Sequence, residues 1–352
     1  KVFDVKLFIK DSQHRSLKQL LLSETIMLKH AYFTVLLLAG LANSAHAQHP
    51  FDHSPINNNK SAQWIKQGIQ YKKDVPSDVD LLVSLDQQQY PALKKLIQQF
   101  AQQHQLNISV SDGTCGISAG LLSRKQADIG GFCCPPGAND RLPGLKFHTL
   151  GIAAVAMITH PDNPTDNVSF EQAQKLFSGE IESWNELPKI ADARNVQPIT
   201  RLHCKKRPGH WKLLLEDENF FSPMAVDMGA IPDVITHTHQ TPGAIGYETL
   251  DMVQRYQGSE KVKILNVNGS RPDDLQALAA GRYPLYRTYS ITTWQGTAHN
   301  PLADKLVAYL IQQLESQAIE KNLLTPSKLR QAGWQFNGDE LISAPPPPHS
   351  KH

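Results

Sequence analysis

The sequence predicts an α/β protein with two lobes, each a mixed, mostly parallel β-sheet with helices on both faces. Strand-like apolar segments alternate with helical patterns along the chain, as in parallel sheets. One segment, residues 150–159 (LGIAAVAMIT), is apolar without a break, as expected for a central strand buried on both faces. The length of 352 residues exceeds that of a typical single domain, so two lobes fit the chain.

The first elements follow from their apolar pattern. They are expected in the order strand, helix, strand, helix, strand over residues 79–85, 90–103, 107–111, 113–126 and 127–131. In the first helix, apolar side chains recur every three or four positions and form one buried stripe. These side chains are Leu93, Leu96, Ile97 and Phe100.

Two later helices are marked by their starts. Ser169 precedes a helical pattern and Gln172 stands at its third position, which together predict a capping box. Asn300 and Pro301 begin another helix. Its apolar side chains are Leu302, Leu306, Tyr309, Leu310 and Leu314.

The first 47 residues are interpreted as a leader rather than as part of the fold. A basic start at Lys29, an apolar run over 31–41 and an Ala-x-Ala sequence ending at Ala47 are the features of a cleaved secretory signal. Met27 is then the start of the signal, and residues 1–26 are an upstream extension. The apolar run is shorter than the ~20 residues of a transmembrane helix, although an uncleaved anchor is the alternative. We therefore expect an exported protein in a compartment where thiols can oxidise.

Both ends of the mature chain are expected to lie outside the lobes. Residues 48–78 are polar, with Asn57, Asn58 and Asn59 in sequence, and are interpreted as a loosely attached arm. Residues 341–352 contain four successive prolines and two histidines, which predict an extended tail.

Composition excludes several classes of protein. A content of 40% hydrophobic and 19% charged residues excludes a disordered or coiled-coil protein. The net charge of +2 is too small for a protein that binds nucleic acid by neutralising phosphates. The sequence contains no zinc-protease helix, Walker loop or dinucleotide fingerprint. We therefore expect a binding protein and not an enzyme.

Five segments resemble one family. Residues 170–184 (FEQAQKLFSGEIESW), 241–247 (TPGAIGY) and 283–287 (YPLYR) are similar to signatures of PstS-like phosphate-binding periplasmic proteins. Residues 127–129 (ADI) and 113–116 (GTCG) stand where that family has a strand start and a Gly-rich helix start. The motifs occur in the order of the family and cover most of the chain between the arm and the tail.

The resemblance implies a type II periplasmic binding fold, with a ligand cleft between lobes that closes by hinge motion. Lobe one is expected to comprise residues 79–155 plus 262–340, and lobe two residues 156–261. The implied function is a monomeric periplasmic receptor that traps phosphate or a related oxyanion. Its implied partners are the membrane components of an ABC-type transporter.

Four loops are expected to line the cleft, over residues 84–89, 112–116, 130–136 and 201–211. In the family, helix N-termini and hydroxyl groups hold the anion. Three of the four loops lack the Ser and Thr residues of that pattern. Arg201 matches the anion-contacting arginine of the family, and a guanidinium can grip two oxygens at once. The candidate ligand-binding residues are Gln88, Gln89, Thr114, Cys115, Gly116, Cys133, Cys134, Arg201, Cys204, Lys205, Arg207 and His210.

All four cysteines of the chain fall on these loops, and three hypotheses about them stay open. They could form disulfides, in any of three pairings. With His203 or His210 they could bind a metal ion that prefers sulfur and imidazole, such as Cu, Zn or iron. They could also act as a redox or ligand-capturing thiol site. A Cys/His-ligated metal or redox protein on the same fold is therefore the alternative function; the metal ligands would be Cys115, Cys133, Cys134, Cys204 and His203.

The remaining polar and aromatic clusters have simpler interpretations. The basic run 205–207 could be a solvated surface. His237 and His239 would share one face of a strand, although a polar surface pair is commoner. Four aromatic residues are expected in the core rather than at a ligand: Trp184, Trp211, Phe220 and Phe221.

Overall fold

A computed structural model describes residues 51–191, 193–258, 261–317 and 322–345. The predicted leader and upstream extension, and most of the predicted tail, lie outside these ranges. Among the described residues, no helix is long and apolar enough to cross a membrane.

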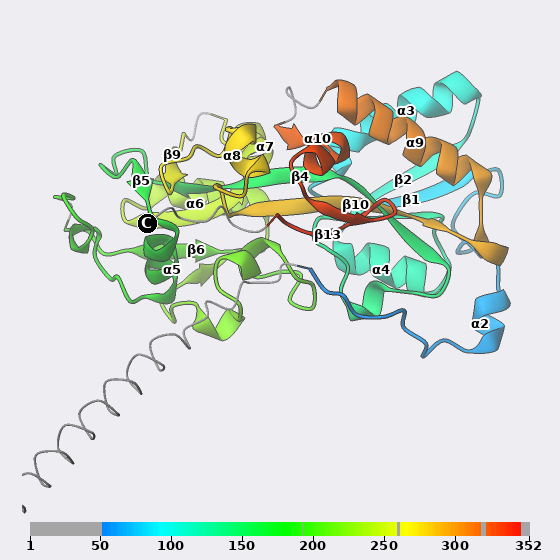
Figure 1. The fold of residues 1–352 in the computed structure, drawn as a ribbon, viewed down its shortest axis with the longest axis horizontal. Coiled ribbons are helices and arrows are strands. Elements are labelled where there is room, and N and C mark those ends of the chain that lie inside the picture. Colours follow the sequence, from blue (N-terminus) through cyan, green and yellow to red (C-terminus); the bar gives the residue numbers. More distant parts are fainter. Residues whose placement is uncertain (1–50, 192, 259–260, 318–321, 346–352) are drawn as a thin grey trace, which may run out of the picture. The chain divides into compact units, whose positions relative to one another are not determined.

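Strands and helices alternate as predicted (Figure 1). The first group is α2 (Ala62–Lys66), β1 (Leu81–Asp86), α3 (Tyr90–His104), β2 (Ile108–Gly113), α4 (Cys115–Ser123) and β3 (Ile129–Phe132). The middle group is β4 (Leu145–Thr159), β5 (Asn167–Val168), α5 (Phe170–Ser178), β6 (Gln197–Thr200), β7 (Val226–Asp227), α6 (Ile231–Gln240), β8 (Ala244–Thr249) and α7 (Leu250–Tyr256). The last group is β9 (Lys263–Val267), α8 (Leu275–Ala279), β10 (Tyr286–Trp294), α9 (Pro301–Ser316), β11 (Leu323–Leu324), α10 (Pro326–Gln331), β12 (Gln335–Asn337) and β13 (Glu340–Ser343).

Eleven of the described strands form one mixed sheet in which β4 is the shared strand. Residues 145–154 of β4 pair antiparallel with β10, and residues 155–159 pair antiparallel with β8. Beyond β10 lie the parallel strands β3, β1 and β2, and beyond β8 lie the parallel strands β6 and β7. The predicted α/β class with a mixed sheet is confirmed.

The central strand is buried over most of its length. Every residue of β4 from Phe147 to Thr159 is buried, as its unbroken apolar sequence predicts. On one face, α3 and α9 lie side by side, and α4 lies on the other (Figure 1). The stripe of Leu93, Leu96, Ile97 and Phe100 is buried with β1 and α9.

Both predicted helix starts are present. Ser169 Oγ accepts a hydrogen bond from the Gln172 N–H at 3.0 Å, and Gln172 Oε1 accepts one from the Ser169 N–H at 2.8 Å. This is the predicted capping box at α5. Helix α9 begins at Pro301, and Asn300 Oδ1 accepts a hydrogen bond from the Leu302 N–H.

The prediction of a loosely attached arm is wrong for its described residues. Trp64 in α2 donates from Nε1 to the carbonyl of Ser123 at 3.0 Å, and its ring meets that of Trp294 edge-on at 6.0 Å between centroids. Lys125 Nζ lies 4.4 Å from the centroid of Trp64. A polar segment can pack in this way because one aromatic side chain supplies a large apolar contact area.

Three smaller predictions also need correction. The predicted tail begins at residue 341, but Glu340–Ser343 pairs with β12 as strand β13. His237 and His239 lie on helix α6 rather than on a strand. Phe220 is 58% exposed, whereas Trp184, Trp211 and Phe221 are buried as expected.

Candidate functional site

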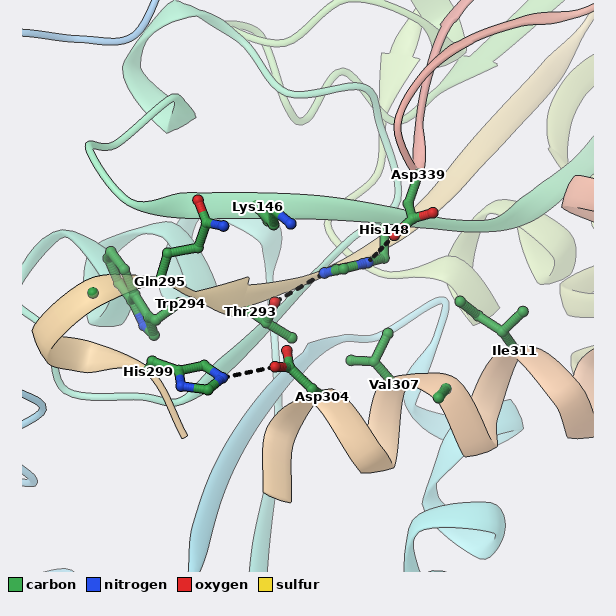
Figure 2. A pocket seen from close by; sticks show the side chains of 12 residues that line it. Lys146, His148, Thr293, Trp294, Gln295, His299, Asp304, Val307, Ile311 and Asp339 are labelled. Atoms are coloured by element: carbon green, nitrogen blue, oxygen red, sulfur yellow. Dashed lines mark hydrogen bonds and ion pairs between the residues drawn. The ribbon is translucent and has the colours of Figure 1, made fainter. Parts of the chain in front are cut away.

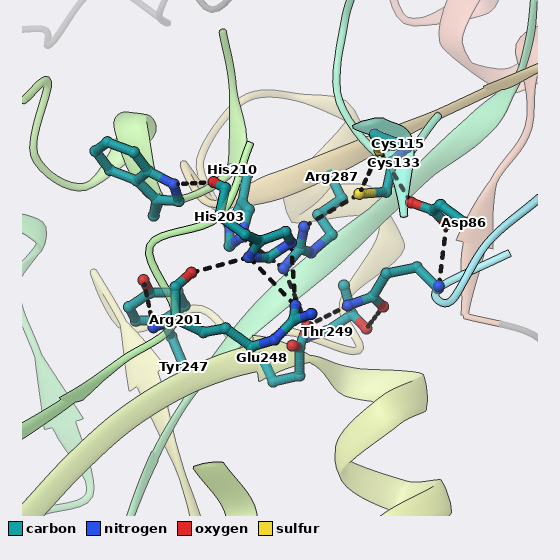
Figure 3. A network of polar contacts seen from close by, with 12 residues as sticks. Asp86, Cys115, Cys133, Arg201, His203, His210, Tyr247, Glu248, Thr249 and Arg287 are labelled. Carbon is teal, nitrogen blue, oxygen red and sulfur yellow. Dashed lines mark hydrogen bonds and ion pairs between the residues drawn. The ribbon is translucent and has the colours of Figure 1, made fainter. Parts of the chain in front are cut away.

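The carboxyl ends of β2 and β3, which lie on either side of β1, bring two cysteines together. Strand β1 ends at Asp86, and helix α4 begins at Cys115 just after β2. Strand β3 ends at Phe132, directly before Cys133. Because these strands are parallel neighbours, their carboxyl ends meet at one edge. Cys115 Sγ therefore lies 3.3 Å from Cys133 Sγ and 3.2 Å from Asp86 Oδ2 (Figure 3).

The loop after β6 supplies a third thiol. The Sγ atoms of Cys115, Cys133 and Cys204 all lie within 4.8 Å of one another. Cys115 and Cys133 are buried, and Cys204 is partly exposed. We call these three residues the thiol cluster. Cys134 is also buried and hydrogen-bonds to Cys133 and Cys204, but it is not one of these three.

The four cysteines are free thiols in this structure. None of the three disulfide pairings that the sequence leaves open is present: Cys115 Sγ and Cys133 Sγ are 3.3 Å apart, whereas a disulfide requires about 2.05 Å. Hydrogen bonds from Cys115 and Cys134 lower the pKa of Cys133, and hydrogen bonds from Cys115, Cys133 and Cys134 lower the pKa of Cys204. The pKa of Cys115 is raised by its hydrogen bonds to Cys133 and Cys204. Thiolate character is therefore concentrated on Cys133 and Cys204.

A buried arginine of β10 contacts the thiol cluster. Arg287 is 1% exposed, and its Nη1 lies 3.5 Å from Cys133 Sγ. Its Nη2 lies 3.3 Å from Glu248 Oε1 and donates to His210 Nε2 at 2.6 Å (Figure 3). Burial and the charge of Arg287 hold the pKa of His210 well below its usual range. A neutral His210 can accept this hydrogen bond.

Two further arginines lie on the loop that carries Cys204. Arg207 is paired with Asp140 at 2.7 Å and donates to the carbonyl of Cys115. Arg201 is 5% exposed and donates from Nε to the carbonyl of Gly229.

His203 joins Arg201 to the thiol cluster. Arg201 Nη1 lies 3.0 Å from His203 Nε2. Burial lowers the pKa of His203, but hydrogen bonds to Cys133 and Cys204 outweigh it and raise the pKa to about 9. The His203 ring is therefore a second cation beside Arg201 at neutral pH.

The structure brings together most of the residues predicted for the site, but it gives four of them other partners. Gln88 donates to Glu248 Oε1 at 2.8 Å, and Gln89 donates to the carbonyls of residues 132 and 290. Thr114 Oγ1 caps α4 by accepting from the Ile117 N–H. Lys205 pairs with Glu218 at the surface. Gly116 lies in the first turn of α4.

Sequence reasoning missed three buried charged residues of the site. Asp86, Glu248 and Arg287 are each 1% exposed. Burial raises the pKa of Asp86 well above its usual range, and the negative charge of Cys133 raises it further. Two of these residues could have been found from the family motifs, because Glu248 directly follows the GAIGY segment and Arg287 ends the YPLYR segment. These motifs carry the family resemblance, and they also mark two charged residues of the site.

A separate cavity of about 480 Å³ lies between β4, β10 and α9 (Figure 2). His148 hydrogen-bonds there to Asp339 and Thr293, and His299 pairs with Asp304. No residue predicted for the ligand site lines this cavity.

Comparison with known proteins places the chain in a family. The model of the PBP superfamily domain matches residues 62–313. The phosphate-binding protein PstS of Bacillus subtilis (strain 168) is 26% identical over 191 residues, which is 51% of this chain and 56% of that protein. The aligned region thus spans little more than half of that relative.

Two solved structures share the fold. A crystal structure of an ABC-type phosphate transport receptor from Vibrio cholerae aligns with a TM-score of 0.58 and 19% identity, over 70% of this chain and all of that one. A putative phosphate ABC transporter substrate-binding protein from Clostridium perfringens, with bound phosphate, aligns with a TM-score of 0.58 and 16% identity, over 70% of this chain and 98% of that one. The predicted type II periplasmic binding fold is confirmed. The chain belongs to the PBP superfamily.

Proposed function

We propose that this protein is an exported, periplasmic receptor that captures a small oxyanion of the phosphate class and delivers it to an ABC-type transporter. It acts as a monomer and catalyses no reaction. Its relatives support this role, since the similar proteins are named as phosphate-binding proteins and transport receptors.

The observation that carries the proposal is the environment of Arg201. Buried charges in proteins are normally paired. Arg201 is 5% exposed, yet it forms no ion pair with a carboxylate of the described residues. Its guanidinium donates to the Gly229 carbonyl and lies beside the His203 ring, which as a cation cannot accept a hydrogen bond from it. An oxyanion bound here would supply the missing negative charge and accept two hydrogen bonds from the guanidinium.

The site draws on both predicted lobes. Cys115, Cys133 and Arg287 belong to the segments proposed as lobe one, whereas Arg201 and Glu248 belong to those proposed as lobe two. The ion pair between Arg287 and Glu248 and the hydrogen bond from Arg207 to the Cys115 carbonyl cross this boundary. A ligand held between the lobes would therefore favour the closed arrangement.

Thermal unfolding with and without anion tests the proposal. Phosphate at ~100 times its dissociation constant stabilises a folded receptor by about 2.7 kcal/mol, so the melting temperature of the reduced, metal-free protein should rise. Arsenate should act in the same way because it has the same shape and charge. Arg201→Ala should fold but lose the phosphate-dependent rise.

Arg271→Ala is the matched control, since Arg271 is an exposed arginine that pairs only with Asp273. It should keep the full rise. The proposal fails if neither anion changes the melting temperature of the wild-type protein, or if Arg201→Ala responds to phosphate as the wild type does.

A further inference from the structure

We propose that the Sγ atoms of Cys115, Cys133 and Cys204 form a three-thiolate binding site for a soft, thiophilic d¹⁰ metal ion, such as Cu⁺ or Zn²⁺. This inference goes beyond the anion receptor, because none of the phosphate-binding relatives is described as a metal-binding protein. It holds or fails independently of phosphate binding.

The separation of the sulfur atoms fits a shared ion. Zn–S bonds are about 2.3 Å long, so two thiolates on one tetrahedral ion lie ~3.8 Å apart. In the thiol cluster, the Cys115 and Cys133 sulfur atoms are 3.3 Å apart, and no two of the three sulfur atoms are more than 4.8 Å apart. Shifts of less than about 1 Å would bring the three sulfurs into this geometry.

The elements that carry the thiols suit a binding site. Cys115 begins α4 and Cys133 follows β3, so both are held by the buried framework. Cys204 comes from the loop after β6, is partly exposed and has a left-handed backbone with φ 57°. A non-glycine residue in this conformation is uncommon and often marks a functional position. The framework therefore fixes the positions of two sulfur ligands, and the exposed loop supplies the third.

The charges around the thiol cluster match the charge of such a complex. Three thiolates and one divalent ion leave a net charge of −1, and a monovalent ion leaves −2. Arg287 lies 3.5 Å from Cys133 Sγ, and Arg207 contacts the Cys115 carbonyl. These guanidinium groups are paired with Glu248 and Asp140, but their N–H groups at the cluster and its backbone would still offset part of the excess negative charge. Three protein ligands also leave a fourth coordination position, which a water molecule or an anion can take, so the two proposals are compatible.

Cadmium titration of the reduced protein in phosphate-free buffer tests the site, because Cd²⁺ bound to thiolates absorbs in the near ultraviolet. We expect saturation at one Cd²⁺ per chain, with release of protons from the thiols. Zn²⁺ should abolish the band by competition. Cys204→Ser, which changes a partly exposed loop residue, should fold normally and weaken Cd²⁺ binding by more than about tenfold. Cys133→Ser should do the same.

Cys134→Ser is the comparison variant, because Cys134 lies outside the thiol cluster and a serine hydroxyl can still donate a hydrogen bond to Cys133. Its Cd²⁺ affinity should fall by much less than that of Cys133→Ser. The inference is overturned if the reduced wild type gives no thiolate band, if Cys204→Ser binds as tightly as the wild type, or if Cys134→Ser loses as much affinity as Cys133→Ser. Phosphate is absent, so failure here leaves the anion proposal standing, and a phosphate failure leaves this site standing.

Discussion

Arg287 and Glu248 show how this protein keeps a charge in its interior. Both side chains are at most 1% exposed and lie 3.3 Å apart. Glu248 Oε1 also accepts hydrogen bonds from Gln88 and from the Thr249 N–H. Removing charges from water is costly, and a buried pair offsets that cost only when further hydrogen bonds satisfy it. Neither charge is therefore stable in the interior without the other.

Removing one partner should be strongly destabilising. Arg287→Met leaves Glu248 buried without its cation, so the free energy of unfolding should fall by about 3–5 kcal/mol. The double variant Arg287→Met/Glu248→Gln should recover part of this loss. Urea denaturation measures both. Arg271→Met, in an exposed pair, should cost at most about 1 kcal/mol. Equal losses for Arg287→Met and Arg271→Met would contradict the role of burial.

His148 should make the folded state sensitive to acid. Burial lowers the pKa of His148 below its ordinary value of 6.5, although Asp339 opposes the shift. As the pH falls below about 6.5, the unfolded chain binds a proton here that the folded chain does not. Stability contributed by neutral His148 is thus complete above that pH and is lost as the pH falls towards the lower folded pKa.

Urea midpoints measured from about pH 7.5 to pH 5 test this effect. His148→Gln should flatten the decline at acid pH. Some slope should remain, because burial also lowers the pKa of His210. Gln295→Ala, at an exposed position of the same cavity that does not titrate, should keep the wild-type slope. A decline in His148→Gln as steep as in the wild type would rule out this source of acid sensitivity.

At the scale of elements, the predictable features are those that local sequence determines. The capping box of Ser169 and Gln172 needs residues three positions apart, and the buried strand β4 needs a run of apolar side chains. Packing of the arm could not be predicted in this way. Trp64 is docked by Ser123 and Trp294, which are remote in sequence.

The capping box should contribute measurably to stability. Ser169→Ala removes the acceptor of the Gln172 N–H, so the free energy of unfolding should fall by about 1 kcal/mol. Ser169→Asp should retain most of the stability, since Asp is also a good N-cap. Chemical denaturation is the measurement, and Ser178→Ala, at the other end of α5, is the control. A loss in Ser178→Ala equal to that in Ser169→Ala would argue against the cap.

At the scale of the whole molecule, the family motifs predicted the fold. They also predicted which loops line the cleft, and the cysteines on those loops lie close together in the structure. The buried charges were harder to predict. Asp86, Glu248 and Arg287 each stand alone at a strand end or in a strand, and their pairing depends on which strands are neighbours. Lys205 was predicted as a ligand-binding residue and is not near the ligand site by its side chain. It lies one residue from Cys204, but its side chain pairs with Glu218 at the surface. Loop side chains have no period from which their direction can be predicted.

The thiol cluster offers sulfur ligands for a metal ion, and Arg201 offers a positive charge for an anion. Both lie on loops that converge from the two proposed lobes. We propose that this protein holds a small anion there. Native mass spectrometry of the reduced, metal-free protein equilibrated with phosphate is the direct test. We expect one phosphate per native chain, lost on denaturation and absent from Arg201→Ala. The same native mass with and without phosphate would contradict it.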